Sequence, residues 1–236
     1  LETTARRLIW GKGYNAGQTC VAPDYALVEH RHREALIAAL ARERQRLYGL
    51  NPLESPDLGC IVNQTQFDRL EALLQQARQR DQILVGGNSD PGRRRIEPTV
   101  VAVDDAEDPL MQDELFGPIL PLLSIDSLSE ALTLINDRDK PLALYLFSND
   151  SQAQQAVLAG TSSGTVVFND VIVQAGDANL PFGGVGPSGM GSYHGEAGFK
   201  TFSHQRTVLS RRFWGDLPMR YPPYAGTLPL LQRLMG

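Results

Sequence analysis

The stretch TQFDRLEALLQQARQRDQILVGG, residues 65–87, decides the fold class of this chain. Apolar side chains recur in its first part three or four residues apart, as on the buried face of a helix. The residues of that face are Phe67, Leu70, Leu73, Leu74 and Ala77. The run ILV that follows, residues 83–85, ends at two glycines and has the composition of a buried strand. A helix that passes directly into a buried strand is typical of α/β folds.

The same alternation extends in both directions along the chain. Further helices are predicted at residues 2–13, 32–47, 127–136 and 150–159. Further strands are predicted at residues 25–28, 98–103, 119–125, 142–147 and 165–168, although Pro121 weakens the third of these. Because strands alternate with helices, we expect an α/β fold with a mostly parallel sheet and flanking helices. Glycines and prolines are so dense in residues 181–198 that a long ordered loop is expected there.

The composition is that of a globular protein, because 42% of the 236 residues are hydrophobic and 21% are charged. The net charge is −5 and the single basic cluster, residues 93–95, is typical of a solvated turn, so nucleic acid is not an expected partner. No apolar run reaches the roughly 18 residues of a transmembrane segment. The two cysteines, Cys20 and Cys60, lie far apart and favour a reduced, cytoplasmic protein.

The motif NAGQTC, residues 15–20, is the first candidate for chemistry. Gly17 permits an unusual backbone just before the thiol, and polar side chains surround it. A cysteine on such a loop, with free backbone N–H groups nearby, can act as a nucleophile beside an oxyanion donor. The alternative for any single cysteine is a small buried hydrophobic residue, which is what we expect of Cys60.

Two further motifs follow. In ELFGP, residues 114–118, Glu114 is either a loop carboxylate before a core phenylalanine or an acceptor for ribose hydroxyls, with Phe116 packed on a nicotinamide. In PFGGVGPSG, residues 181–189, the last six residues match the dinucleotide fingerprint, but no strand precedes them and no helix is expected after them. That match is therefore interpreted as a coincidence. No histidine stands at metal-ligand spacing, so no metal site is expected.

Together the segments 15–20, 114–118 and 181–184 resemble the aldehyde dehydrogenase superfamily, in the order and at the separations of that family. The stretches 135–145, 193–195, 201–206 and 220–223 resemble class 3, which includes fatty, aromatic and coniferyl-type enzymes. The resemblance implies that Cys20 is the nucleophile and that its N–H helps bind the oxyanion. It also implies that Glu114 and Phe116 bind NAD or NADP, and that Asn15 and Phe182 border the substrate pocket.

The resemblance also implies a general base and a dinucleotide-binding domain upstream of the cysteine, where this sequence has only nineteen residues. We therefore expect residues 1–210 to form the catalytic domain and residues 211–236 a tail that could serve oligomerisation. The upstream dinucleotide-binding domain, with the rest of the N-terminal half, is expected to be absent from this chain. Class 3 relatives suggest a homodimer. One departure is Gln174, because many class 3 members have a histidine after the preceding Asn-Asp-Val-Ile-Val stretch.

The implied reaction is NAD(P)-dependent oxidation of an aldehyde to a carboxylic acid through a cysteine thiohemiacetal and a thioester. Class 3 favours medium-chain, long-chain or aromatic aldehydes. Residues 1–236 alone are expected to be inactive. Two alternatives stay open: a non-catalytic folded fragment that mainly oligomerises, and a cysteine hydrolase. The hydrolase would require His194 or His204 to form a hydrogen bond with Cys20.

Overall fold

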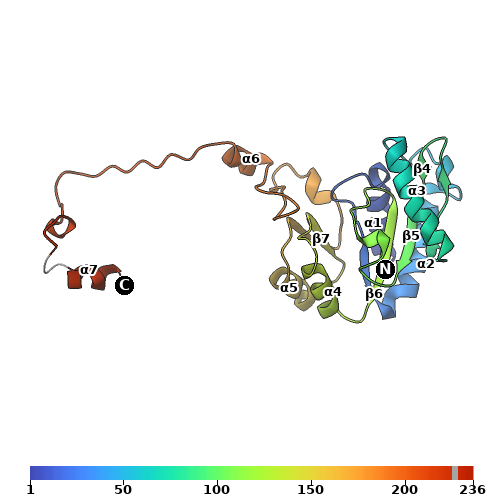
Figure 1. Cartoon of the computed structure of the whole chain (residues 1–236), viewed down its shortest axis with the longest axis horizontal. Coiled ribbons are helices and arrows are strands. Elements are labelled where there is room, and N and C mark those ends of the chain that lie inside the picture. Colours follow the sequence, from blue (N-terminus) through green and yellow to red (C-terminus); the bar gives the residue numbers. More distant parts are fainter. Residues whose placement is uncertain (225–227, 236) are drawn as a thin grey trace. The chain divides into compact units, whose positions relative to one another are not determined.

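The computed structural model describes residues 1–224 and 228–235 and divides into two units, Leu1–Phe202 and Ser203–Gly236 (Figure 1). This division lies before the boundary predicted after residue 210. The first unit holds every regular element up to α6. The described part of the second unit contains a short 3₁₀ turn, Pro218–Arg220, and helix α7, Leu228–Met235.

The main sheet has four strands in the order β1-β6-β5-β2. Their bounds are Ala26–Glu29 (β1), Ile119–Ile125 (β6), Thr99–Val103 (β5) and Ile83–Val85 (β2). The first three run parallel and β2 is antiparallel to β5, so the prediction of a mostly parallel sheet is confirmed. Pro121 pairs with Val101 of β5 but stands one residue before β1 joins at Leu122. At that position β6 has only one neighbouring strand, which is where a proline is tolerated.

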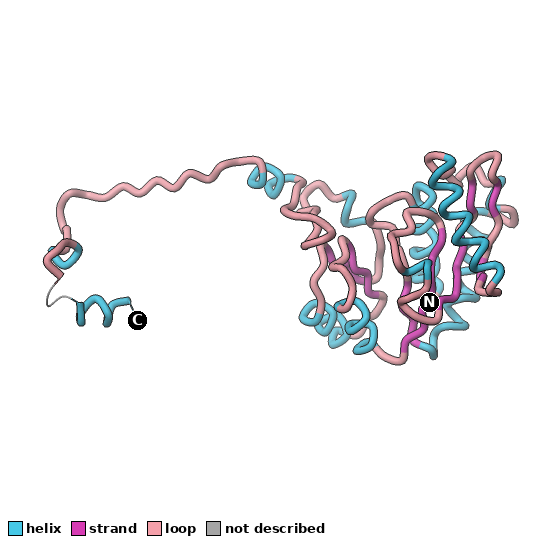
Figure 2. Tube along the Cα trace, viewed as in Figure 1, coloured by secondary structure: helices cyan, strands magenta, loops and turns pink. Residues whose placement is uncertain are grey.

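Both faces of this sheet are covered by helices, as Figure 2 shows for the first unit. Helices α1, Glu2–Gly13, and α2, His30–Tyr48, share one apolar cluster with Val100 and Leu122. Helix α3, Gln64–Gln79, belongs to a second cluster with the neighbouring residues Val101 and Leu123. Because successive strand residues point to opposite faces, a strand buried on both sides is apolar without interruption.

A smaller parallel pair, β7 and β8, lies between α4, α5 and the later loops (Figure 1). The bounds are Leu128–Asn136 (α4), Ala143–Leu146 (β7), Ser151–Gly160 (α5), Thr165–Phe168 (β8) and Gly195–Thr201 (α6). Short strands Ser89–Asp90 (β3) and Arg95–Ile96 (β4) form a hairpin. The remaining 3₁₀ segments are Tyr14–Gly17, Pro52–Glu54, Pro109–Met111 and Val173–Gly176.

The loop predicted for residues 181–198 is correct up to residue 194 and wrong beyond it, because α6 begins at Gly195. A seven-residue helix that includes Gly195 and Gly198 has no apolar periodicity strong enough to reveal it. The fingerprint-like residues 184–189 contain no helix and follow no ladder strand, so they lack the context of a dinucleotide site.

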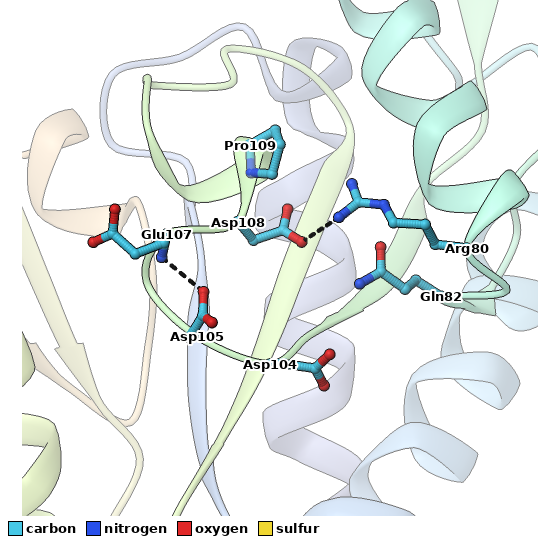
Figure 3. Close-up of a pocket in the computed structure, with 7 residues that line it drawn as sticks. All are labelled: Arg80, Gln82, Asp104, Asp105, Glu107, Asp108 and Pro109. Carbon is cyan, nitrogen blue, oxygen red and sulfur yellow. Dashed lines mark hydrogen bonds and ion pairs between the residues drawn. The ribbon is translucent and has the colours of Figure 1, made fainter.

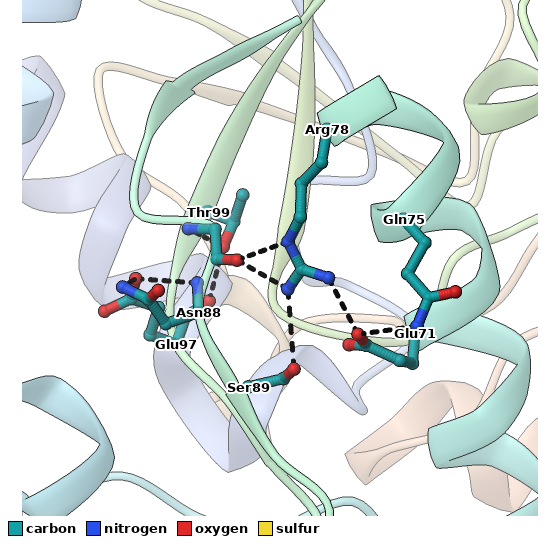
Figure 4. Close-up of polar contacts among 8 residues, drawn as sticks. Glu71, Gln75, Arg78, Asn88, Ser89, Glu97 and Thr99 are labelled. Carbon is teal, nitrogen blue, oxygen red and sulfur yellow. Dashed lines mark hydrogen bonds and ion pairs between the residues drawn. The ribbon is translucent and has the colours of Figure 1, made fainter. Parts of the chain in front are cut away.

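Gly87, the second glycine after β2, is held by a partly buried polar network (Figure 4). Arg78 donates to the Gly87 carbonyl from Nε at 2.8 Å and from Nη2 at 2.5 Å, and its Nη1 donates to Glu71 at 2.7 Å. Glu97, only 1% exposed, accepts from the backbone N–H and the side-chain amide of Asn88. These bonds compensate the buried charges and fix the turn that joins the α3-β2 unit to β5.

Candidate active site

The cysteine loop, residues 14–22, begins where α1 ends. Asn15, Ala16 and Gly17 have φ values of 50°, 52° and 73°, so three successive residues adopt the left-handed conformation. For a residue other than glycine this costs roughly 1–2 kcal/mol. Such a backbone persists only when its surroundings hold it in place.

Gln18 supplies much of that hold. Its side-chain amide donates to the Asn15 carbonyl and to the Cys60 carbonyl, each at 3.0 Å. Its Oε1 accepts from the Val62 N–H at 2.8 Å. The Asn15 side chain donates to the Gln18 carbonyl at 2.9 Å. Gln18 therefore fastens the cysteine loop both to itself and to residues 60–62.

Cys20 stands at the outer corner of a tight turn. The Ala22 N–H donates to the Thr19 carbonyl at 2.9 Å, which closes the turn around Cys20 and Val21. Val21 is 2% exposed, whereas the Cys20 side chain faces solvent and is a free thiol. Among the described residues, none accepts a hydrogen bond from the Cys20 N–H. The turn thus presents a thiol and an unoccupied backbone donor together.

Exposed and buried side chains alternate along residues 114–116 of the segment Glu114–Pro118. Leu115 is buried, with its N–H bonded to Asp24 Oδ1 at 3.0 Å and its carbonyl to Arg69 Nη2 at 2.5 Å. Glu114 and Phe116, on either side of it, are exposed. Phe116 also has a φ of 48°. The anchored Leu115 therefore turns both candidate cofactor-binding side chains away from the core.

The two segments meet through a pair of glycines. A Cβ placed on Gly17 would lie 2.2 Å from the Gly117 carbonyl oxygen and 2.9 Å from Pro118 N. Backbone thus packs directly on backbone, which only glycine allows at this spacing. Fold geometry brings Cys20 and Glu114 into one region although 93 residues separate them in the sequence.

Lys12, near the end of α1, is a buried charge that sequence analysis did not single out. It is 2% exposed, and burial lowers its pKa to about 8, while the Asp24 and Glu114 carboxylates oppose that shift. Glu114 is exposed overall but partly desolvated, and this desolvation, followed by the negative charge of Asp24, raises its pKa. The positive charges of Lys12 and Arg69 oppose the shift. A lysine in the last turn of a helix usually indicates an exposed cation near the negative end of the helix dipole. The position of Lys12 in the sequence therefore predicts exposure, whereas the structure buries it.

The Lys12 burial predicts a specific pH dependence of stability. Between pH 8 and 10.5 the unfolded chain keeps a proton that the folded chain has lost, so the free energy of unfolding rises with pH. The full rise is about 3 kcal/mol. Lys12→Met keeps the aliphatic stem without the charge and should be more stable at pH 7, with no such rise. Urea unfolding at pH 7 to 10.5 measures both curves, and parallel curves would contradict the assignment.

Phe182 lies in a different part of the unit. Its backbone pairs with Tyr193 in both directions at 2.9 Å, and its ring centroid lies 5.7 Å from those of Tyr193 and His194. It packs against the same apolar cluster that contains Val21. The structure therefore connects Phe182 to the cysteine loop through a shared core, without a hydrogen bond between them in the described residues.

Two surface cavities lie elsewhere. One of about 440 Å³ is lined by Arg80, Gln82, Asp104, Asp105, Glu107, Asp108 and Pro109 (Figure 3). One of about 410 Å³ is lined by Glu29, His30, Arg31, Asp126 and Ser127. Arg80 binds Asp108 at 3.0 Å across the first. Neither cavity is lined by Cys20, Glu114 or Phe182. No group of three potential metal ligands occurs within residues 1–224 and 228–235.

The sequence pattern of the aldehyde dehydrogenase family matches residues 1–208. The chain belongs to this family. Aldehyde dehydrogenase family 3 member B1 of Rattus norvegicus is 49% identical over 225 residues, which are 94% of this chain and 47% of that protein. Family 3 member H1 of Arabidopsis thaliana is 44% identical over 237 residues, 100% of this chain and 49% of its own length. The chain thus spans about half the length of the curated relatives it matches.

Solved aldehyde dehydrogenases share the fold. A substrate-bound AldH of Staphylococcus aureus matches with a TM-score of 0.90 and 42% identity, over 100% of this chain and 51% of that one. A betaine aldehyde dehydrogenase double mutant from the same organism, in complex with NAD⁺, matches with a TM-score of 0.74 and 27% identity, over 85% and 42% of the two chains. In this family member, no helix of the described residues is long and apolar enough to cross a membrane.

Proposed function

We propose that the protein containing this chain oxidises an aldehyde to a carboxylic acid with NAD or NADP, with Cys20 as its nucleophile. The observation that carries the proposal is the turn at residues 19–22. It exposes the Cys20 thiol next to its own unoccupied N–H, and its loop packs on the segment that bears Glu114 and Phe116. Nucleophile, oxyanion donor and candidate cofactor contacts therefore share one region.

Cys20 would perform the covalent steps. Its thiolate adds to the aldehyde carbon, and the carbonyl oxygen becomes the oxyanion of a thiohemiacetal. The Cys20 N–H, which has no acceptor among the described residues, would donate to that oxyanion. After oxidation the same carbon is a thioester, and water displaces the thiol to release the carboxylic acid. Cysteine suits both halves because its thiolate is a strong nucleophile and its thioester hydrolyses readily.

The residues around Glu114 fit the nicotinamide end of a dinucleotide. Glu114 offers an exposed carboxylate that can accept ribose hydroxyls, and the exposed Phe116 ring offers an apolar surface two residues further on. The rigid support through Leu115 keeps both in place. A nicotinamide bound there would supply the acceptor for the hydride that leaves the thiohemiacetal.

We propose that the substrates are medium-chain, long-chain or aromatic aldehydes, and that Asn15 and Phe182 border the pocket that binds them. The support is the apolar ring of Phe182 beside Tyr193 and the exposed position of Asn15 at the start of the cysteine loop. Full-length protein assayed with NAD and NADP should show at least about tenfold higher kcat/KM for decanal and benzaldehyde than for acetaldehyde, as a few buried methylenes provide. A preference for acetaldehyde would refute this substrate class, and no turnover of any aldehyde would refute the function.

The cellular setting is part of the same proposal. Two exposed, unpaired cysteines fit a reducing compartment such as the cytoplasm.

The second unit exposes large apolar side chains, those of Phe213, Trp214 and Leu217. Their exposure fits a tail that contacts a second copy in a homodimer. Light scattering on the full-length protein, with and without residues 211–236, tests the dimer.

Glu114→Gln tests the role of the carboxylate. The amide is a weaker acceptor than a carboxylate, so hydride transfer or cofactor affinity should fall about 10- to 100-fold. Hydrolysis of 4-nitrophenyl acetate needs Cys20 but no cofactor, so its rate should change less than about threefold. Stopped-flow NADH formation and ester hydrolysis measure the two effects. A defect confined to ester hydrolysis would instead make Glu114 the base that activates water.

A further inference from the structure

The Tyr145 hydroxyl, on β7, lies at the junction between the cysteine loop and the segment after β8. It donates to the Val21 carbonyl at 2.6 Å. It accepts from the Ile172 N–H at 3.2 Å and from Gln174 Nε2 at 2.9 Å. A tyrosine hydroxyl has one proton to donate and two lone pairs to accept with, so all of its bonding capacity is used.

This saturation fixes the direction of each bond. Because the only hydroxyl proton of Tyr145 points to Val21, Gln174 must present its amide N–H rather than its oxygen. Gln174 is 8% exposed, and its Oε1 has no hydrogen-bond partner among the described residues. A buried acceptor left unpaired destabilises the folded state. An apolar side chain would avoid that cost, so what the amide contributes is its N–H donation. That donation goes to Tyr145 at 2.9 Å and, at the longer distance of 3.5 Å, to Thr165 Oγ1.

The hydroxyl also lies within electrostatic range of the thiol. Burial raises the pKa of Tyr145, the hydrogen bonds from Gln174 and Ile172 oppose that shift, and a negative charge on Cys20 adds to it. Tyr145 therefore stays protonated at neutral pH and keeps its bond to Val21. That bond acts on the corner of the turn adjacent to Cys20, while the Val21 side chain is fixed in the core.

We infer that Tyr145 and Gln174 are a positioning pair that holds the turn of residues 19–22 in the geometry in which Cys20 reacts. The inference rests on the proposed function of Cys20. Gln174 orients the Tyr145 hydroxyl, the hydroxyl fixes the Val21 carbonyl, and the closed turn transmits this to the Cys20 thiol and N–H. Displacement of reacting atoms by about 1 Å can cost on the order of 10²-fold in rate.

The test uses full-length Tyr145→Phe, Gln174→Met and the double variant. Tyr145→Phe should lower kcat and the rate of Cys20 acylation by 4-nitrophenyl acetate about 10- to 100-fold, with KM for the cofactor changed less than about threefold. Gln174→Met should lower both rates about tenfold. The double variant should lose no more than Tyr145→Phe, because Gln174 acts through the hydroxyl. The conservative variant Gln174→His keeps one N–H donor, so both of its rates should stay within about threefold of wild type.

Tyr221→Phe is the matched control, because it removes a hydroxyl that also donates at 2.6 Å, to Asp216 in the second unit. It should leave the acylation rate unchanged. Additive losses in the double variant, or a lower unfolding midpoint with an unchanged acylation rate constant, would overturn the inference. A failure of the proposed function gives a different result from a failure of this inference. If Cys20 is not the nucleophile, Cys20→Ser keeps its acylation rate and turnover.

Discussion

Cys20→Ser in the full-length protein should abolish aldehyde oxidation, with kcat reduced roughly 10³-fold or more. A serine hydroxyl at the corner of the turn is not ionised at neutral pH and lacks the nucleophilicity of a thiolate. The exposed side chain carries no hydrogen bond among the described residues, so the turn itself should survive the substitution. Steady-state NADH formation and the unfolding midpoint separate loss of chemistry from loss of fold.

Cys60→Ser is the matched control for this prediction. Cys60 is also exposed and free, so the expectation of a buried residue at this position is wrong. Among the described residues, its only hydrogen bond to the cysteine loop is the one that its backbone carbonyl accepts from Gln18. A change of its side chain leaves that bond in place, so kcat should stay within about twofold of wild type. Equal losses from Cys60→Ser and Cys20→Ser would show that the thiol at position 20 is not the nucleophile.

Local periodicity was enough to predict most of the regular elements. The stripe from Phe67 to Ala77 lies wholly within α3, and the apolar run at 165–168 is β8 as expected. These signals depend on neighbours a few residues apart, which the sequence displays directly. Helix α6 was missed because seven residues with two glycines carry no such signal.

Of the candidate site, only the residues that belong to local motifs could be predicted from the sequence. The polar loop around Cys20 indicated a reactive thiol, but the contacts that support it come from residues far along the chain. Tyr145 reaches Val21 across 124 residues, and Gln18 reaches Cys60 across 42. No pattern of spacing encodes such contacts, because they depend on how the fold as a whole places distant segments beside the cysteine loop. The burial of Lys12 was hidden for the same reason.

The contact between Gly17 and Gly117 leads to the second large effect. Gly17→Ala places a Cβ 2.2 Å from the Gly117 carbonyl oxygen and 2.4 Å from its carbon, where backbone rather than a flexible side chain must move. It also puts alanine at a φ of 73°, which costs roughly 1 kcal/mol. Overpacking adds about 1–3 kcal/mol. We therefore expect a total loss of about 2–4 kcal/mol in the free energy of unfolding.

Activity should fall further than stability alone explains. The loop cannot shift away from Gly117 without moving Cys20 relative to Glu114, so kcat should drop about 10²-fold even in fully folded protein. Gly186→Ala provides the control, because Gly186 also has a positive φ, 62°, but its nearest neighbour, the Lys140 side chain, is 4.0 Å from the added Cβ. That variant should lose only about 1 kcal/mol and keep its kcat. Urea unfolding and NADH formation measure both quantities, and equal behaviour of the two variants would show that the glycine contact does not set the position of the nucleophile.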